Sequence, residues 1–337
     1  MADQPERTTL PHALSGQRIE LEDPAAGRVS FYRAGPTDPG LAGSASAMNP
    51  MLLIHSVNAS ASAHEVRPLF EYYKQSRPVY AMDLPGFGFS DRSEREYLPQ
   101  LMVDAIFAMD SHIRSECGDR RVDALAVSLA CEFLARAANQ RPRLFRSLAL
   151  VSSTGFRRGT PSDAEPGSTM GRPGVLRGLN KRFVGRPLFR ALTTEASIRF
   201  FLKKTWGRKE IDEQMFRDSC AMAKHPESHN APFYFISGFL FSKDTRALMD
   251  GLTEPVWLSH GVRGDFTDFT LAAEYADRAN WKITEFQTGA LPYFEVPEAF
   301  CAEYDDFLRD AGRQRSTERS DGIGRGPAGS ADDRATA

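Results

Sequence analysis

Three short segments of the chain hold reactive or polar side chains directly after apolar runs. They are L-L-I-H-S-V-N-A-S at residues 52–60, D-L-P-G-F-G-F-S at residues 83–90 and L-A-V-S-L-A-C at residues 125–131. A serine hydroxyl such as that of Ser128 becomes a nucleophile when a base accepts its proton, and an imidazole is the most frequent base. The segments therefore contain groups that could carry out nucleophilic chemistry if the fold brings them together.

Together the three segments resemble the α/β-hydrolase family, in its branch of lipases, esterases and epoxide hydrolases. In that family the first loop has His-Gly after a strand, the second has D-x-x-G-x-G-x-S and the third has G-x-S-x-G. The second motif is intact here, whereas Ser56 replaces a glycine of the first, and Ala126 and Ala130 replace the glycines of the third. The resemblance covers residues 17–310. It implies an α/β fold with a doubly wound, mostly parallel sheet of about eight strands.

By this resemblance Ser128 is the nucleophile, at a strained turn between a strand and a helix. Residues next to such a turn must be small so that the backbones can approach each other, and alanine meets that requirement less generously than glycine. The family's oxyanion hole uses the N–H after the nucleophile and one from the first loop, which would be those of Leu129 and Val57. Ser56 would either add a hydroxyl donor or distort this loop, and His55 lies beside it.

The acid and the histidine of the family follow later strands. The family has an aspartate about three residues after a glycine. This chain has Gly264 at the position of that aspartate, so the next residue, Asp265, is the candidate acid and Asp268 is the alternative. The last family motif resembles G-H-x-P-x-x-E-x-P-E-x-F, and residues 289–300 are G-A-L-P-Y-F-E-V-P-E-A-F. Ala290 therefore stands at the histidine position, and a methyl group cannot accept a proton.

Three groups of histidines could replace the missing base. His260 ends a predicted strand at the carboxyl edge of the sheet, where sites on α/β sheets form. His55 lies in the oxyanion loop, where the family's histidine is structural, and His225 and His229 lie in a later segment. For each of them a structural or solvent-exposed role is the simpler interpretation, and we take His260 as the candidate base. No pair of histidines has metal-ligand spacing with an acidic partner, so no metal site is predicted.

The order of apolar runs predicts which elements position these groups. Two strands at 17–22 and 28–33 form an antiparallel edge, and buried strands are expected at 51–54, 78–82, 122–127, 148–151, 255–259 and 282–286. Helices are expected at 63–74, 98–115, 129–139, 271–278 and 297–308. Strands that alternate with helices of this length favour a parallel sheet covered on both faces.

About a hundred residues interrupt this alternation. We expect a first part of the hydrolase core at 1–153, a helical cap inserted at 154–252 and a second part of the core at 253–311. Between Arg157 and Lys209 the segment has thirteen basic and three acidic residues, interleaved with large apolar ones. Such a basic amphipathic stretch could contact an anionic membrane surface weakly or admit an amphiphilic ligand. The simpler interpretation is a lid whose charges face water.

Composition limits the remaining alternatives. The chain has 337 residues and a net charge of −2, which does not favour nucleic acid binding, and no run is long enough for a membrane span. The four cysteines are far apart and are expected to be isolated buried thiols. The N-terminus has no signal-peptide layout, which predicts a cytoplasmic protein. The polar tail at 312–337 is expected to be disordered, and no cofactor is predicted.

Two functions remain open at this point. In the first, the protein hydrolyses a small lipophilic ester-type substrate, with Ser128, Asp265 and either His260 or a water molecule in an impaired triad. In the second, it is a catalytically silent relative that keeps the pocket to bind a small ligand or a protein partner. The missing histidine favours the second function, whereas the retained serine favours the first. The sequence does not indicate an oligomeric state.

Overall fold

The computed structural model describes residues 10, 12–36, 48–265 and 268–323. Within these residues the chain forms an eight-stranded sheet with the strand order β1-β2-β4-β3-β5-β6-β7-β8. The strands are β1 (Gln17–Asp23), β2 (Gly27–Ala34), β3 (Met51–Ile54), β4 (Val79–Met82), β5 (Val122–Val127), β6 (Phe145–Val151), β7 (Val256–Gly261) and β8 (Trp281–Phe286). The predicted α/β fold with a mostly parallel sheet is confirmed, and every predicted strand is present.

The register of the sheet places the loops that follow the strands at one edge. β1 and β2 are antiparallel, β2 also pairs antiparallel with β4, and all other pairs are parallel. Ile54 of β3 is level with Ala126 of β5, and Val127 of β5 is level with Val151 of β6. The strand interiors are almost fully buried, as expected for parallel strands with helices on both faces. The segments after β3, β5, β6, β7 and β8 therefore meet at the carboxyl edge.

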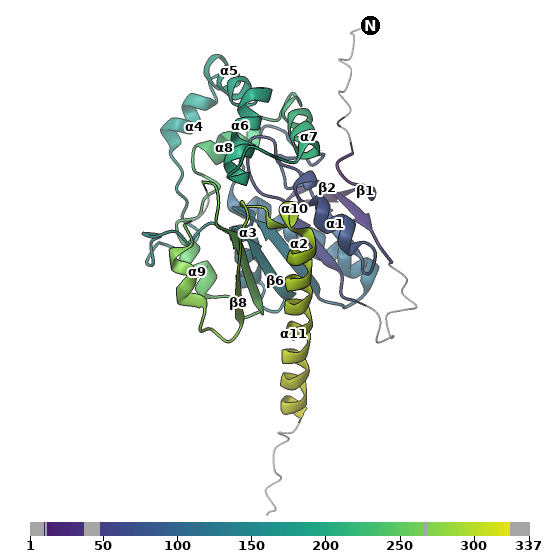
Figure 1. The fold of residues 1–337 in the computed structure, drawn as a ribbon. Coiled ribbons are helices and arrows are strands. Elements are labelled where there is room, and N and C mark those ends of the chain that lie inside the picture. Colours follow the sequence, from purple (N-terminus) through teal and green to yellow (C-terminus); the bar gives the residue numbers. More distant parts are fainter. Residues whose placement is uncertain (1–9, 11, 37–47, 266–267, 324–337) are drawn as a thin grey trace, which may run out of the picture.

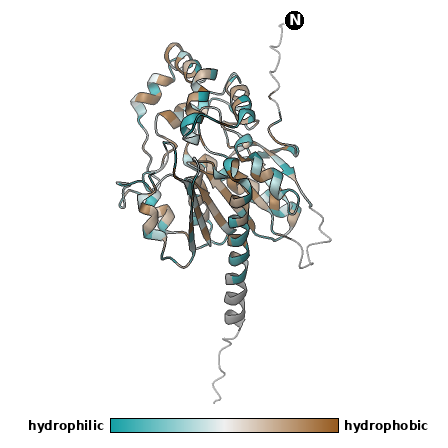
Figure 2. Cartoon of the chain, in the orientation of Figure 1, coloured by the Kyte–Doolittle hydropathy of each residue, from teal (hydrophilic) through white to brown (hydrophobic). Residues whose placement is uncertain are grey.

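Two apolar clusters hold helices against the two faces of the sheet (Figures 1 and 2). One face packs against α2 (Pro99–Cys117), α3 (Ala130–Gln140), α9 (Thr245–Asp250) and the short 3-10 helix η3 (Thr270–Tyr275). The other face packs against α1 (Arg67–Tyr73), which follows the 3-10 turn η2 (Ala63–Val66), and against α10 (Pro292–Glu295) and α11 (Pro297–Ile323). The central strands of the sheet between them are mainly apolar (Figure 2).

Six helices lie between β6 and β7, and we call residues 154–252 the insertion. It contains α4 (Pro173–Leu179), α5 (Arg182–Leu192), α6 (Glu195–Trp206), α7 (Glu213–Ala223), α8 (Asn230–Ile236) and α9. Helices α4 to α8 gather at one end of the molecule, whereas α9 returns to the sheet and packs against α3 (Figure 1). The end of α6 contacts the loop after β8, so α6 reaches the carboxyl edge of the sheet.

The structure corrects three sequence-based expectations. The helix expected at 63–74 begins as the 3-10 turn η2, and the helix expected at 271–278 is only the 3-10 helix η3. Disorder was expected from Gly312, but α11 continues to Ile323, because a helix can extend beyond its packed part through its own backbone hydrogen bonds. The remainder of the predicted tail, residues 324–337, lies outside the described residues.

Two further expectations concern the cysteines and the membrane. All four cysteines are free and buried, as predicted. In the described ranges, no helix has both the length and the apolar character that crossing a bilayer requires.

Candidate active site

Ser128 occupies the corner between β5 and α3. Its φ angle is 56°, in the left-handed region, and its backbone N–H donates to Val151 O on the neighbouring strand at 2.8 Å. A residue other than glycine in this region is less stable by roughly 1–2 kcal/mol than in the right-handed one. Ala126 and Ala130 are fully buried on either side, which fits the need for small residues at the corner.

The Ser128 side chain is accessible and unengaged. The residue is partly exposed, although Leu129 and Ala130 beside it are buried. Its hydroxyl has no hydrogen-bond partner within the described part of the chain. All seven histidines are described, and none of their ring nitrogens is bonded to Ser128. The corner thus presents a free hydroxyl without an attached base.

A buried carboxylate shapes the loop after β3, beside Ser128. Glu65 accepts hydrogen bonds from the backbone N–H of Ser56 at 2.8 Å and from the Asn58 amide at 2.6 Å. Burial raises the pKa of Glu65, and these donors oppose the shift. The adjacent Val57 is buried. The N–H groups of Val57 and Leu129 have no acceptor among the described residues, so both are free to bind an oxyanion, and that role stays a prediction.

His55 is structural in this arrangement. It is fully buried, its Nε2 accepts from the N–H of Leu84 at 3.0 Å and its Nδ1 lies 2.6 Å from Ser56 O. Since Nε2 must be the acceptor, the proton is on Nδ1 and is donated to Ser56. Burial lowers the pKa of His55 to about 4, so the ring is neutral at pH 7. Both ring nitrogens are used, and His55 joins the two loops instead of serving as a base.

The intact D-x-x-G-x-G-x-S segment is also structural. Asp83 is buried and accepts from the N–H groups of Ala63 at 2.8 Å and Phe89 at 2.9 Å. Ser90 closes the turn by donating to Asp83 O at 2.6 Å. Gly88 has φ 51° and faces the Asp83 carboxyl so closely that a Cβ there would overlap it. The turn therefore requires Asp83, Gly88 and Ser90 for its own structure, which accounts for these residues of the motif.

The two candidate acids point into solvent or toward the insertion. The Asp265 carboxylate is 49% exposed and binds the ammonium group of Lys204 on α6 at 2.7 Å. Its backbone N–H donates to Lys204 O at 3.3 Å. Asp268 accepts from the N–H and hydroxyl of Thr270 at the start of η3. Within the described residues neither carboxylate is hydrogen-bonded to a histidine.

His260 lies at the end of β7 and faces the helices of one sheet face. It is buried, its Nδ1 lies 3.1 Å from Gly261 O and its ring stacks on Phe269 with 3.9 Å between centroids. Burial lowers its pKa, which keeps the ring neutral at pH 7. Because β6 separates β5 from β7, the Cα atoms of Ser128 and His260 are roughly 10 Å apart. A general base must have its accepting atom within about 2.6–3.2 Å of the hydroxyl oxygen that it deprotonates.

Ala290 lies in the loop after β8, and both its backbone N–H and its carbonyl group are hydrogen-bonded. Its N–H donates to Thr205 O near the end of α6 at 2.9 Å, and its carbonyl accepts from the Ser152 hydroxyl at 2.6 Å. The neighbouring Gly289 packs so closely on Thr205 and Trp206 that a Cβ would meet their backbone atoms within 2.6 Å. The insertion is thus docked against the loop that carries Ala290.

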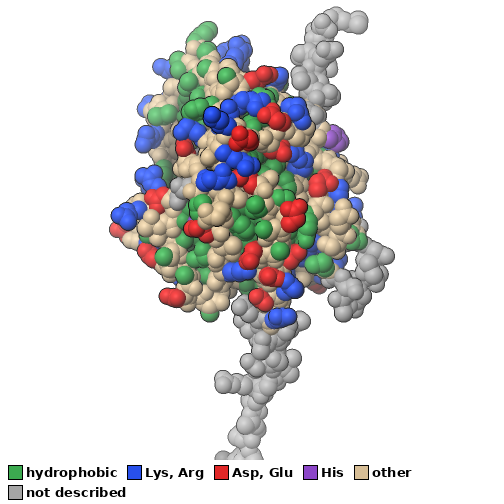
Figure 3. Space-filling model, viewed as in Figure 1, with side chains coloured by type: hydrophobic (Ala, Val, Ile, Leu, Met, Phe, Trp, Pro, Cys, Tyr) green, Lys and Arg blue, Asp and Glu red, His purple; other side chains and the backbone are tan. Residues whose placement is uncertain are grey.

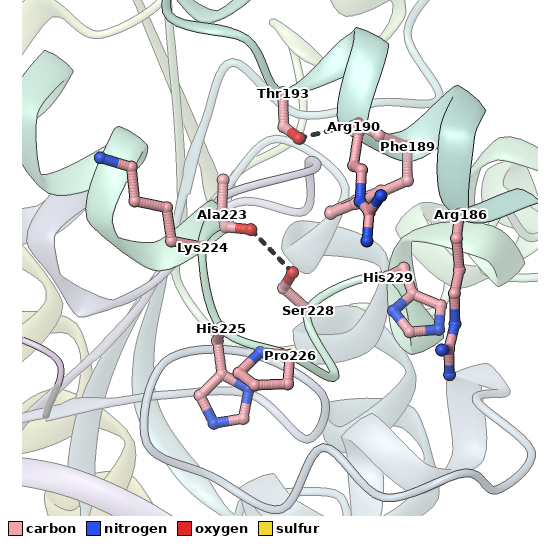
Figure 4. Close-up of a pocket in the computed structure, with 10 residues that line it drawn as sticks. All are labelled: Arg186, Phe189, Arg190, Thr193, Ala223, Lys224, His225, Pro226, Ser228 and His229. Atoms are coloured by element: carbon pink, nitrogen blue, oxygen red, sulfur yellow. Dashed lines mark hydrogen bonds between the residues drawn. The ribbon is translucent and has the colours of Figure 1, made fainter. Parts of the chain in front are cut away.

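The two histidines of the insertion line a separate cavity of about 460 Å³ between α5 and the α7–α8 segment (Figure 4). Its lining includes Arg186, Phe189, Arg190, Lys224, His225 and His229. Burial lowers the pKa of His225 to about 4 and also lowers that of His229. The His229 ring packs against Phe189 and Phe233. His225 and His229 therefore form part of the wall of a cavity within the insertion.

Sequence reasoning missed three residues around the corner. Glu132, one turn after Ser128, is buried, and burial raises its pKa to about 7. It accepts from the Thr154 hydroxyl and from Ser242 N–H, near the two ends of the insertion. Ser152 has φ 48° and donates to Ala290 O, and Glu65 holds the loop after β3. The one signal in the sequence was the position of Glu132, a carboxylate four residues after Ser128 in an otherwise apolar part of the predicted helix.

The comparisons agree with this geometry. A sequence model of the alpha/beta hydrolase family matches residues 51–303, which is most of the chain. The chain belongs to the alpha/beta hydrolase family. No curated protein matches it.

Several solved structures share the fold. A probable hydrolytic enzyme from Pseudomonas aeruginosa PAO1 is 18% identical with a TM-score of 0.66, over 89% of this chain and 96% of the other. An esterase from Exiguobacterium antarcticum is 15% identical with a TM-score of 0.64, over 87% and 99% of the two chains. The Cif epoxide hydrolase from Acinetobacter nosocomialis is 16% identical with a TM-score of 0.61, over 87% and 88%. At these identities the similarity shows the fold.

Proposed function

We propose that this chain binds a small lipophilic ester-type compound at Ser128 and does not hydrolyse it through a serine–histidine–acid triad. The observation that carries the proposal is the unpartnered hydroxyl of Ser128, which has no imidazole bonded to it in the described residues. Ala290 stands where the family has its histidine, and Asp265 is paired with Lys204. In subtilisin, loss of the serine or the histidine alone lowers turnover by about 2 × 10⁶.

The binding part of the proposal rests on the two N–H groups near Ser128. Those of Leu129 and Val57 have no acceptor among the described residues, and a carbonyl oxygen is the group that such a pair accommodates. The structurally similar proteins include an esterase and a lipase described as putative, which favours an ester-type ligand for this site as well.

A fluorophosphonate probe tests the proposal, because it modifies only serines that are activated. We expect the wild-type protein to remain unlabelled at neutral pH, and binding of a non-hydrolysable lipophilic ester analogue to be measurable by calorimetry. Ser128→Trp should abolish that binding by filling the corner. Prompt labelling that disappears in Ser128→Ala would contradict catalytic silence.

A second function is favoured by the strained conformation of Ser128. A φ of 56° costs free energy, and helix α3 could begin without it. A slow ester hydrolase, with Ser128 as nucleophile and His260 or a water molecule as base, would explain why the strain persists. Measurable turnover of a short p-nitrophenyl ester that falls to background in Ser128→Ala, and falls further in His260→Gln than in His225→Gln, would support this second function.

A further inference from the structure

The outer side of α5 is apolar, although it faces away from the rest of the molecule. Phe183 is 92% exposed, Val184 51% and Leu188 43%, and Pro187 is exposed as well. These four residues follow an i, i+1, i+4, i+5 spacing, which places them on one side of a helix. A helix on the surface of a globular protein normally directs polar residues outward.

The inner side of the same helix is already packed. Gly185 and Phe189 are buried, and Phe189 packs against Phe233 of α8 in a small apolar cluster with Leu179. A Cβ at Gly185 would meet Leu179 O at 1.8 Å, so α5 cannot rotate to exchange its two sides without losing this close contact. The insertion therefore cannot bury the exposed apolar residues of α5 by a small rotation of this helix.

Basic residues border this apolar side. Arg182, Arg186 and Arg190 follow an i, i+4, i+8 spacing and form a row along α5. Arg186 and Arg190 are exposed and also line the rim of the cavity beside His229 (Figure 4). Residues 166–194 contain six basic residues and no acidic one. The six are Arg172, Arg177, Lys181, Arg182, Arg186 and Arg190, and all are exposed. No ion pair in the described part of the chain involves any of them, in contrast to Arg199 and Lys204 on the next helix.

We propose that the α4–α5 face docks this protein on an anionic lipid bilayer. We define the face as the exposed apolar residues Val175, Phe183, Val184, Pro187 and Leu188 together with the six basic residues (Figure 3, upper part of the view). Helix α5 then lies parallel to the membrane, with its apolar side about 5–10 Å deep at the boundary of headgroups and acyl chains. The row of arginines meets the phosphates of the headgroups.

Charge complementarity favours a bilayer over a second copy of this chain. Two copies joined through this face would oppose twelve uncompensated cations in a shared low-dielectric contact, since each copy contributes six. An anionic bilayer supplies the opposite charge and an apolar layer at the same time. The docking surface lies on the insertion and does not depend on what happens at Ser128, so it goes beyond the proposed function.

Vesicle flotation with the full chain tests the proposal. We expect binding to vesicles rich in phosphatidylglycerol at low salt, weak binding to pure phosphatidylcholine vesicles, and release at high NaCl. Replacing Arg182, Arg186 and Arg190 by Gln should lower the partition coefficient by about fivefold for each charge. Phe183→Ser should lower it by about tenfold or more, because a large apolar side chain is lost from the contact. As a matched control, Lys209→Gln with Arg309→Gln and Arg313→Gln removes three charges elsewhere and should leave binding close to wild type.

Insertion into the bilayer has its own readout. The native tryptophans Trp206, Trp257 and Trp281 are all buried. Phe183→Trp therefore adds one exposed fluorophore, whose emission should shift to the blue and be quenched by brominated acyl chains on anionic vesicles.

Three results would overturn the proposal. They are absence of binding to anionic vesicles at low salt, an equal loss of binding in the three-charge control, and concentration-dependent dimerisation without lipid that Phe183→Ser abolishes. The last of these would assign the face to a second copy.

Discussion

The hydroxyl of Ser152 donates a hydrogen bond to the carbonyl oxygen of Ala290 at 2.6 Å. Ser152 follows β6, the strand next to the one that ends at Ser128, and its φ of 48° makes it a second strained residue at this edge of the sheet. The loop that carries Ala290 is thus fastened to the sheet one strand away from the serine. Its position does not depend on the side chain at residue 290.

Because the backbone at Ala290 is fixed, Ala290→His tests how much of the hydrolase machinery remains. We expect this variant to gain fluorophosphonate reactivity and esterase activity over the wild-type chain, because an imidazole would then be available at the position that the sequence motif predicts for the family's histidine. The side chain is larger in a buried place, so a loss of about 1–3 kcal/mol in the free energy of unfolding is expected as well. Initial rates with a short ester and the thermal midpoint measure the two effects.

Ala290→Gln is the matched control, since glutamine has a similar size but cannot act as a base. It should show the same loss of stability without activity, and Ala290→His combined with Ser128→Ala should be inactive. If Ala290→His folds yet stays inert, the acid or the oxyanion loop has also lost its function, as the exposed pairing of Asp265 with Lys204 would explain.

Ser152 allows the hydrogen bond and the backbone strain to be separated. Ser152→Ala loses the bond to Ala290 and keeps the strained φ, so we expect a loss of about 0.5–1.5 kcal/mol. Ser152→Gly loses the same bond, but glycine adopts positive φ without the Cβ penalty of roughly 1–2 kcal/mol. Chemical denaturation should therefore show the glycine variant to be the more stable of the two by about 1 kcal/mol. The reverse order would mean that Ser152 is not strained in solution.

Gly289→Ala should loosen the contact between the insertion and the core. The added Cβ would lie 2.5 Å from Thr205 O and 2.6 Å from the Cα of Trp206, and both are backbone atoms that cannot move independently. We expect destabilisation by more than about 1 kcal/mol. Trypsin should also cleave faster after the basic residues near the end of α6, such as Lys203 and Arg208.

Gly174→Ala is the control for this experiment. Gly174 is the second residue of α4, and nothing lies within 4 Å of the position its Cβ would occupy. Alanine there should leave the protein unchanged or slightly more stable, with a wild-type cleavage pattern. Equal cleavage rates for both variants would show that α6 is not held by its contact with Gly289.

Glu132 predicts a specific pH dependence of stability. Burial raises its pKa from 4.5 to about 7 in the folded protein. Between about pH 4.5 and 7 the folded chain therefore holds a proton that the unfolded chain has released. The contribution of Glu132 to the free energy of unfolding is complete below this interval, falls as the pH rises through it, by up to about 1.4 kcal/mol per unit, and is constant above it.

Glu132→Gln isolates this effect. The Asp83 carboxyl, whose pKa is raised to about 6, and the neutral buried His55 also titrate between folded and unfolded states, but they are present in both proteins. The stability of wild type minus that of Glu132→Gln should fall by about 1–3 kcal/mol between pH 5 and 7.5 in urea titrations. If this difference in stability did not change with pH, the pKa of Glu132 would not be raised in the folded protein.

The strands were predictable because each is a short apolar run that ends in turn residues. β3 and β5 have the bounds expected from sequence, and Ser128 lies at the expected corner. Apolar spacing predicted a helix at 271–278, but it did not show that residues 270–275 form only a 3-10 helix, whose Tyr275 packs on Phe156. Local patterns thus located the elements better than their exact type.

The surroundings of the site were less predictable, because they depend on contacts between distant parts of the chain. Asp265 was expected near a histidine, but its partner is Lys204, sixty-one residues earlier. The role of Glu65 depends on how η2 packs beside the β3 loop, which no spacing in the sequence reveals. The roles proposed for Ser128, Leu129 and Val57 remain predictions for the experiments above.

Glu132 binds the insertion near both of its ends. One carboxylate oxygen holds Thr154, just after β6, the other holds Ser242, just before α9, and Thr205 fastens a middle point to Ala290. A segment clamped at three places is not free to swing aside as one rigid gate. Displacing the insertion as one body would have to break all three hydrogen bonds together, whereas the movement of a single helix can leave them intact.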